Sequence, residues 1–175
     1  MDLERKESFW YAVYTYPRIE KKILSRMNDA DIEAFLPLTT VIRQWSDRKK
    51  KMTVPLFPNY IFVRLDLKEK YRVLQTDGVV KFVSIQGVPC KIAESEIETI
   101  KKLSQSGTNI TTNEELVEGM PIRIVDGPLV GVEGILEEKK GKARLLVRIN
   151  SLRQTACVDV SAEMIELIRT GLASA

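Results

Sequence analysis

Residues 55–63 read PLFPNYIFV, a stretch that closes one predicted strand, turns at two prolines and opens another. Tyr60 to Leu65 is rich in β-branched and aromatic residues and predicts a strand, and Thr53 to Leu56 has the same character. Val41 to Trp45 predicts a further strand upstream. The segment between them, Ser46 to Lys51, is polar and strongly basic, so we interpret it as the tip of a hairpin.

The rest of the first half of the chain alternates strands with amphipathic helices. Phe9 to Tyr16, Ile32 to Leu36 and Val79 to Ile85 predict strands. Helices are predicted from the apolar spacing of residues 19–27, from the capping pattern that opens at Asp66, and over Ala93 to Ser106. We therefore expect residues 8–106 to form an α+β domain in which helices flank an antiparallel sheet.

The second half of the chain carries short strands alone. Residues 107–115 are mostly polar and predict a flexible linker. Residues 116–170 then alternate apolar and polar positions, as at Leu145, Val147 and Ile149, and glycine-containing turns separate the alternating runs. This pattern predicts a small antiparallel β-barrel.

The composition excludes most catalytic chemistry. The 175 residues contain no histidine, which rules out Ser-His and Cys-His nucleophile systems. The spacing of Gly127, Gly131 and Gly134 does not match a nucleotide-binding fingerprint, so these glycines are interpreted as backbone turns with positive φ. Cys90 and Cys157 match no zinc spacing and are interpreted as small core or edge residues. We expect no enzymatic activity, no metal and no cofactor.

The charge balance and the ends of the chain suggest where the protein acts. The net charge is only +3, with 27 basic and 24 acidic residues, so any contact with nucleic acid should be a local patch. The first seven residues are charged and lack an apolar signal core, and no apolar run approaches the length needed to span a membrane. We expect a cytoplasmic protein that is monomeric.

The predicted hairpin tip is one of two candidate sites. It concentrates positive charge in a short segment that comprises Arg43, Arg48, Lys49, Lys50 and Lys51. Neutralisation of phosphates is the functional interpretation, and a solubilising loop is the alternative; the residues alone weigh the two about equally.

An aromatic cluster is the second candidate site. Its members are Trp10, Tyr11, Phe57, Tyr60 and Phe62. Because successive side chains of a strand point to opposite faces, Trp10 and Tyr11 cannot both point to the same side. The sequence is therefore compatible with an exposed apolar patch that docks a partner, or with a sheet covered on both faces by helices.

In this order, four motifs resemble the NusG family. They are Trp10–Val13, the PLFPNYIFV stretch at 55–63, Gly78–Val83, and the segment Asp126–Gly134, which is similar to the turn of a KOW barrel at Gly127, Pro128, Gly131 and Gly134. The resemblance covers residues 9–169. It implies an NGN domain followed by an SH3-like KOW domain.

The family resemblance implies a mechanism. The NGN domain would bind the clamp helices of the largest RNA polymerase subunit and suppress pausing, with no catalysis of its own. The KOW domain would recruit a ribosomal protein or a termination factor. Carried over by position, the polymerase-binding residues would be Trp10, Phe57, Pro58, Tyr60 and Phe82.

Within the family, Asn59 and the stretch 43–51 resemble specialised paralogues of the UpxY and RfaH type, which act as operon-specific antiterminators and in some cases contact non-template DNA. General NusG proteins usually have glycine at the position of Asn59. The chain departs from RfaH at Glu69–Arg72, where RfaH has a Thr-rich second polymerase contact, and in its β-patterned C-terminal domain, which we expect to be a barrel at rest.

Two other functions remain as alternatives. One is a general NusG elongation factor. The other is a free-standing RNA-binding module, supported by basic residues of the predicted barrel: Lys139, Lys140, Lys142, Arg144, Arg148 and Arg153.

Overall fold

The computed structural model describes residues 7–107, 110–113, 119, 121–139, 142–161 and 164–168. The chain divides into two compact units, Met1–Ile100 and Lys101–Ala175. Among the helices within the described ranges, none has both the length and the apolar character needed to cross a membrane.

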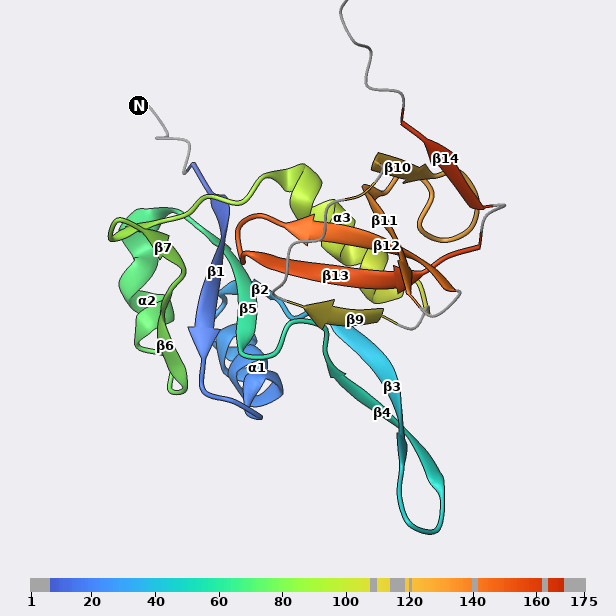
Figure 1. Ribbon diagram of the computed structural model, residues 1–175. Coiled ribbons are helices and arrows are strands. Elements are labelled where there is room, and N and C mark those ends of the chain that lie inside the picture. Colours follow the sequence, from blue (N-terminus) through green and yellow to red (C-terminus); the bar gives the residue numbers. More distant parts are fainter. Residues whose placement is uncertain are drawn as a thin grey trace, which may run out of the picture. The chain divides into compact units, whose positions relative to one another are not determined.

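A four-stranded antiparallel sheet organises the first unit, with strand order β2-β5-β1-β6. Its strands are β1 (Phe9–Thr15), β2 (Glu33–Phe35), β5 (Tyr60–Leu65) and β6 (Val79–Phe82). The helical elements are the 3₁₀ turn η1 (Leu67–Glu69) and two helices labelled in Figure 1, α1 (Glu20–Asp29) and α2 (Lys70–Leu74). The predicted strands and the first predicted helix are confirmed here within one or two residues, except that the strand predicted over 79–85 is split in two. The helix predicted from Asp66 is a 3₁₀ turn followed by α2, which ends at Leu74.

One face of this sheet packs on the helices. Tyr11 and Val13 of β1 lie beside Ile61 and Val63 of β5, and α1 adds Ile23 and Met27 to the same cluster. Each large aliphatic side chain buried in this way contributes about 1.5–3 kcal/mol relative to an exposed one. The apolar spacing that predicted α1 therefore marks the stripe that holds the helix to the sheet.

The opposite face of the sheet also carries buried side chains, those of Trp10, Ala12 and Phe62. Trp10 and Tyr11 are 5% and 1% exposed, although they lie on opposite faces of β1. The interpretation with an exposed apolar patch therefore does not hold at these two positions. The alternative of a sheet that is covered on both faces therefore fits Trp10 and Tyr11.

Two short ribbons and a helix complete this part of the chain. The ribbons are β3 (Leu38–Gln44) with β4 (Lys49–Pro55), and β7 (Ser84–Ile85) with β8 (Val88–Pro89). Helix α3 (Glu94–Gln105) follows and confirms the helix predicted over residues 93–106. Its apolar stripe, Ile97, Ile100 and Leu103, is fully buried.

After the end of helix α3, the described residues of the second unit form a six-stranded sheet in the order β14-β10-β11-β12-β13-β9. Its strands are β9 (Ile110–Asn113), β10 (Pro121–Ile124), β11 (Glu133–Lys139), β12 (Lys142–Ile149), β13 (Gln154–Asp159) and β14 (Ile165–Leu167). The alternating residues that predicted a barrel, such as Leu145, Val147 and Ile149, are buried at 0–3% exposure. The α+β domain and the all-β region are thus both as predicted.

One segment differs from the sequence-based expectation. Residues 110–113 lie inside the predicted linker, yet they form β9 and pair with β13 in antiparallel register. The segment reads Ile-Thr-Thr-Asn, and its β-branched residues favour an extended backbone even though the segment is polar. Residues 108, 109, 114 and 115 of the predicted linker lie outside the described residues.

Candidate functional site

The corner between β4 and β5 contains the PLFPNY segment. Leu56 and Phe57 are buried, with 2% and 0% of their surface exposed, whereas Pro58 is exposed and Tyr60 is half-buried. The amide of Tyr60 donates to the carbonyl of Phe57 at 3.3 Å, which closes the turn. The corner therefore presents Pro58 and part of Tyr60 on an anchor of buried side chains.

Asn59 holds this corner in a backbone conformation that few residues tolerate. Its φ is +70°, in the left-handed region, where asparagine and glycine are the favoured residues. Its amide donates to the carboxylate of Glu20 at 3.0 Å, and its carbonyl accepts from the amide of Thr15 at 2.8 Å. Asparagine and glycine both meet this backbone requirement.

Strand alternation sets which side chains share the face of the sheet that carries Tyr60. Tyr14 pairs with Tyr60 and Ala12 pairs with Phe62, so these residues lie on the face that also carries Trp10. The rings of Tyr14 and Tyr60 meet edge to face with centroids 5.5 Å apart, and both residues are half-buried. Tyr14 lies near the end of β1 and Tyr60 at the start of β5, next to Pro58, and we call these three residues the aromatic edge.

The structure does not bring all five predicted polymerase-binding residues to the surface. Trp10 and Phe57 are 5% and 0% exposed, and the Phe57 ring packs edge to face on Phe62. Phe82 lies on the other, helix-covered face, where its ring meets Tyr11 at 6.1 Å. Of the predicted set, Pro58 and Tyr60 are thus the accessible members.

Tyr14 is a half-buried aromatic residue beside Tyr60 that the sequence interpretation did not include. It lies four positions after Trp10, so the period of two along a strand places both side chains on one face. That spacing is a signal that could have identified it.

The predicted basic hairpin is a two-stranded ribbon, β3–β4, which we call the basic ribbon. Figure 1 shows it extending away from the four-stranded sheet of the first unit. At its base, Lys21 of α1 donates to the carbonyl of Thr53 at 2.8 Å, and the amide of Leu56 donates to the carbonyl of Pro37 at 2.8 Å. Its root is therefore fixed to the domain.

The five predicted cations lie in the outer part of the basic ribbon, and all are exposed: Arg43, Arg48, Lys49, Lys50 and Lys51. The turn is shorter than predicted, because Lys49, Lys50 and Lys51 are part of β4 and pair with β3. Within the described ranges, none of the five side chains forms a hydrogen bond or an ion pair. Their charge is therefore available to a partner.

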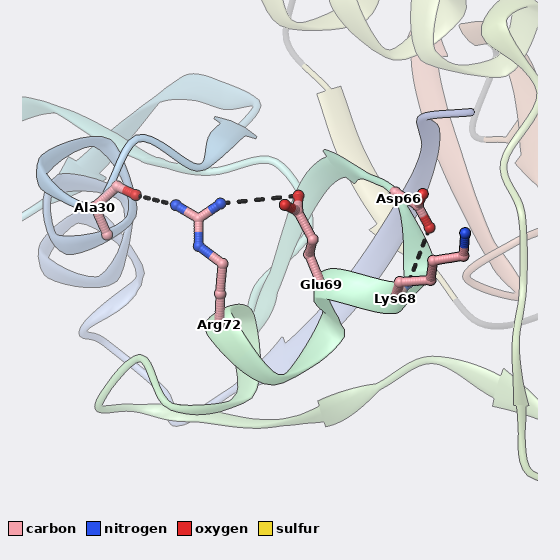
Figure 2. Close-up of polar contacts among 5 residues, drawn as sticks. All are labelled: Ala30, Asp66, Lys68, Glu69 and Arg72. Carbon is pink, nitrogen blue, oxygen red and sulfur yellow. Dashed lines mark hydrogen bonds and ion pairs between the residues drawn. The ribbon is translucent and has the colours of Figure 1, made fainter. Parts of the chain in front are cut away.

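The segment Glu69–Arg72 is occupied by contacts within the domain. Figure 2 shows Arg72 donating to the carbonyl of Ala30 at 2.7 Å and pairing with Glu69 at 3.8 Å. The carboxylate of Asp66 accepts from the amide of Lys68 at 2.9 Å and caps η1. These contacts hold η1 and α2 against the end of α1, and they leave Tyr71, 65% exposed, as the accessible aromatic residue of the segment.

The predicted KOW turn has the expected backbone at two of its glycines. Gly127 and Gly131 both have φ of +85°, and the amide of Gly131 donates to the carbonyl of Ile124 at 2.8 Å. Gly134 differs, because it lies in β11 and its φ is not positive. A Cβ at Gly134 would collide with the carbonyl oxygen of Leu146, so glycine is required there by close strand approach.

The basic residues of the second unit differ in whether they are ion-paired or exposed. Arg144 pairs with Asp159 at 3.1 Å, whereas Arg148 and Arg153 are exposed. Lys139 and Lys142 lie at the ends of β11 and β12, and Lys140 lies outside the described residues.

Among the described residues, the pKa values of Tyr11 and Arg123 are shifted. Burial raises the pKa of the Tyr11 phenol, and the carboxylate of Asp66 raises it further. The hydrogen bond from Arg123 to Glu133 raises the pKa of that guanidinium. Tyr11 is a core residue and Arg123 is an exposed ion-paired residue, so neither shift indicates catalysis.

Comparison with known proteins identifies the family. A family model described as "Transcription termination factor nusG" matches residues 8–101. The chain belongs to the NusG family. Among similar proteins, the transcription termination/antitermination protein NusG of Staphylococcus aureus is 30% identical over 174 residues, which cover 90% of this chain and 94% of that protein. Its counterpart in Pseudomonas aeruginosa is 24% identical over 173 residues, with 91% and 98% covered.

A solved structure of a NusG protein shares the fold. The structure titled "Domain interaction in Thermotoga maritima NusG" superposes with a TM-score of 0.59 at 22% identity, and the match covers 93% of this chain and 98% of that one. Both the predicted family and the predicted fold class are therefore confirmed. The chain is a homologue of proteins that act in transcription termination and antitermination.

Proposed function

We propose that this NusG-family protein is a transcription elongation and antitermination factor that binds RNA polymerase and has no catalytic activity. The aromatic edge would dock on the clamp helices of the largest polymerase subunit, and the basic ribbon would contact nearby DNA. The observation that carries the proposal is the coexistence, in one unit, of an accessible aromatic edge and five exposed, unpaired cations.

The docking role of the aromatic edge rests on its construction. Tyr60 and Tyr14 support each other edge to face, and Pro58 is held next to them by the left-handed backbone of Asn59. Rigid aromatic side chains lose little conformational entropy on binding and are favoured interface anchors. Trp10 and Phe57, which are buried, would act as the support beneath this edge.

Capture of purified RNA polymerase by tagged protein tests the docking role. Tyr60→Ala and Tyr14→Ala should each weaken capture by about 1–3 kcal/mol, as truncated interface anchors do. Tyr71→Ala is the matched control, because it removes an exposed tyrosine from α2 in the same unit. Equal capture by all three variants and the unchanged protein would exclude the aromatic edge as the docking surface. Phe57→Ala is unsuitable, since it empties a core site.

The proposed action is locus-specific rather than general. The support is the concentration of charge in the basic ribbon, which suits a contact with exposed DNA. Because Asn59 satisfies a backbone requirement that glycine also meets, it adds little to this distinction. A transcription assay on templates with different leader sequences tests the proposal. Readthrough on one class of leader supports it, whereas equal stimulation on all templates indicates a general NusG factor.

The KOW domain would recruit a further partner, such as a ribosomal protein or a termination factor. Val125 and Val130 flank the Gly127 turn and are 43% and 47% exposed, which gives the turn an apolar surface. Val130→Asp should abolish a partner interaction while capture of polymerase through the first unit persists. Loss of polymerase capture by this variant would contradict the assignment of separate roles.

A further inference from the structure

The basic ribbon carries an exposed tryptophan, Trp45, among the cations that are proposed to contact DNA. Trp45 follows β3 directly, and its amide donates to the carbonyl of Arg48 at 2.8 Å, which closes the end of the ribbon. Its side chain is 54% exposed. A large apolar residue at the tip of a projecting ribbon is unusual, because burial of such a side chain would be strongly favourable.

Strand register determines which residues surround Trp45. Arg43 pairs with Lys50, and Trp45 is opposite Arg48 two positions further along. Residues directly opposite each other share a face, and so do residues two apart in a strand. Trp45, Arg48, Arg43 and Lys50 therefore lie on one face of the ribbon.

The other face of the ribbon carries two of the five cations, Lys49 and Lys51, and no aromatic residue. Gln44 pairs with Lys49, and Ile42 pairs with Lys51. Ile42 is 64% exposed, so this face also carries an accessible apolar side chain next to cations. The two faces thus form a natural comparison, in which one has an indole ring among cations and the other an aliphatic side chain among cations.

The chemistry of the aromatic face fits a strand of nucleic acid with unpaired bases. Cations neutralise phosphates, and a flat aromatic ring stacks on a base whose faces are free. In a duplex both faces of each base are already covered by neighbouring bases, so the indole ring would gain contact only by forcing the steps apart. The single carboxylate of the tip, Asp47, leaves the surrounding charge positive.

We propose that Trp45 stacks on an unpaired base of single-stranded DNA whose phosphates are bound by Arg43, Arg48 and Lys50. The proposal rests on the DNA contact proposed above for the basic ribbon, and it specifies the form of DNA and the residue that holds the base. Stacking tolerates any base, so Trp45 would supply affinity for exposed strands rather than base identity.

Fluorescence titration of the full chain tests the stacking directly. The chain has two tryptophans, and Trp10 is buried, so quenching by DNA reports mainly on Trp45. The probe is a single-stranded DNA of about 12 nucleotides, within the usual site size of such proteins. The affinities of the variants are compared by the anisotropy of a fluorescently labelled strand, because Trp45→Ala and Trp45→Phe lack the reporting indole. Trp45→Ala should weaken binding by about 5- to 100-fold, Trp45→Phe should retain most of the affinity, and Ile42→Ala should bind as the unchanged protein does.

Three further probes separate stacking from charge. An abasic strand of the same length keeps the phosphates but lacks bases, so the unchanged protein and Trp45→Ala should bind it equally. A duplex of the same sequence should bind more weakly and with no dependence on Trp45. A single-stranded RNA should bind no tighter than the DNA; tighter, Trp45-dependent binding of RNA or of duplex would overturn the assignment to single-stranded DNA.

The controls keep a failure of stacking distinct from a failure of the ribbon contact. Lys50→Ala removes a phosphate-binding cation from the face that carries Trp45 and should weaken binding, whereas Lys51→Ala removes a cation from the other face and should weaken binding less. If Trp45→Ala binds single-stranded DNA as tightly as the unchanged protein does, while the lysine variants bind it more weakly, stacking is overturned and the ribbon contact remains. No binding of any probe by the unchanged protein would overturn both. Thermal melts establish that each variant is folded.

Discussion

Two substitutions of Asn59, to alanine and to glycine, distinguish a requirement for its left-handed backbone conformation from a role of its side chain. Its φ of +70° lies in the left-handed region, where a Cβ costs most residues roughly 1–2 kcal/mol. Glycine has no Cβ and does not carry this cost, but the greater conformational entropy of the unfolded chain lowers the stability of the folded state by about 0.4–1 kcal/mol. We therefore expect Asn59→Ala to lower the free energy of unfolding by about 1–2 kcal/mol, and Asn59→Gly to change it by less than about 1 kcal/mol.

Both substitutions leave the hydrogen bonds of the corner available. The amide of Asn59 donates to Glu20 and its carbonyl accepts from Thr15, and these are main-chain groups that alanine and glycine also possess. The difference between the two variants therefore isolates the backbone conformation. Glu20 is only 5% exposed, so movement of residue 59 away from it would leave a buried carboxylate without this donor and add to the cost for alanine.

Urea unfolding followed by tryptophan fluorescence measures the effect in the relevant unit. Both tryptophans, Trp10 and Trp45, lie in the first unit, and Trp10 is buried, so its emission changes on unfolding. With a denaturant slope of about 2 kcal/mol per M, the midpoint should fall by about 0.5–1 M for Asn59→Ala and by less than about 0.5 M for Asn59→Gly. Equal losses for the two variants would refute the reasoning and assign the role to the side-chain amide.

Two further predictions concern the barrel and the core. Gly134→Ala should destabilise the second unit by about 1–3 kcal/mol, because its Cβ would meet the backbone of Leu146, which cannot move aside cheaply; a far-UV circular dichroism melt matching that of Arg148→Ala would contradict this. The pKa of Tyr11 is raised by burial and by Asp66, so its contribution to stability is complete below the unfolded pKa of about 10 and is lost as the pH rises through the folded value. Tyr11→Phe should therefore lose less stability above about pH 10 than the control Tyr14→Phe, and coincident profiles would contradict the assignment.

Local patterns predicted the elements, and long-range packing determined what the patterns could not. The strand at Tyr60–Leu65 and the stripe of α1 depend on period and composition, so they were recovered from the sequence. Whether Trp10 faces solvent depends on what covers the second face of the sheet, which no local pattern contains. Burial of both Trp10 and Tyr11 is therefore information that arises only in the folded chain.

The candidate site shows the same division. The cations of the basic ribbon were predicted because exposure is the default for lysine and arginine. Phe82 was misplaced, since residues that share a motif need not share a face; its pairing with Val13 puts it on the helix-covered side. Gly134 was identified as a required glycine, but for the wrong reason, because a close approach between strands is a tertiary contact.

The distribution of charge implies separate roles for the aromatic edge and the basic ribbon. Residues 43–51 contain five cations and one carboxylate, and removing them from the 27 basic and 24 acidic residues leaves 22 and 23. The rest of the chain is therefore close to neutral, and the ribbon carries the excess of positive charge. Binding to polymerase through the apolar edge should depend little on salt, whereas each phosphate bound by the ribbon should add about 0.7–0.9 to the salt slope. Among the described residues, the hydrogen bonds of Lys21 to Thr53 and of Leu56 to Pro37 fix the root of the ribbon, whereas its five cations lie farther out. We therefore expect that these charges can be changed without disturbing the docking face, so that affinity for polymerase and affinity for DNA can be altered independently.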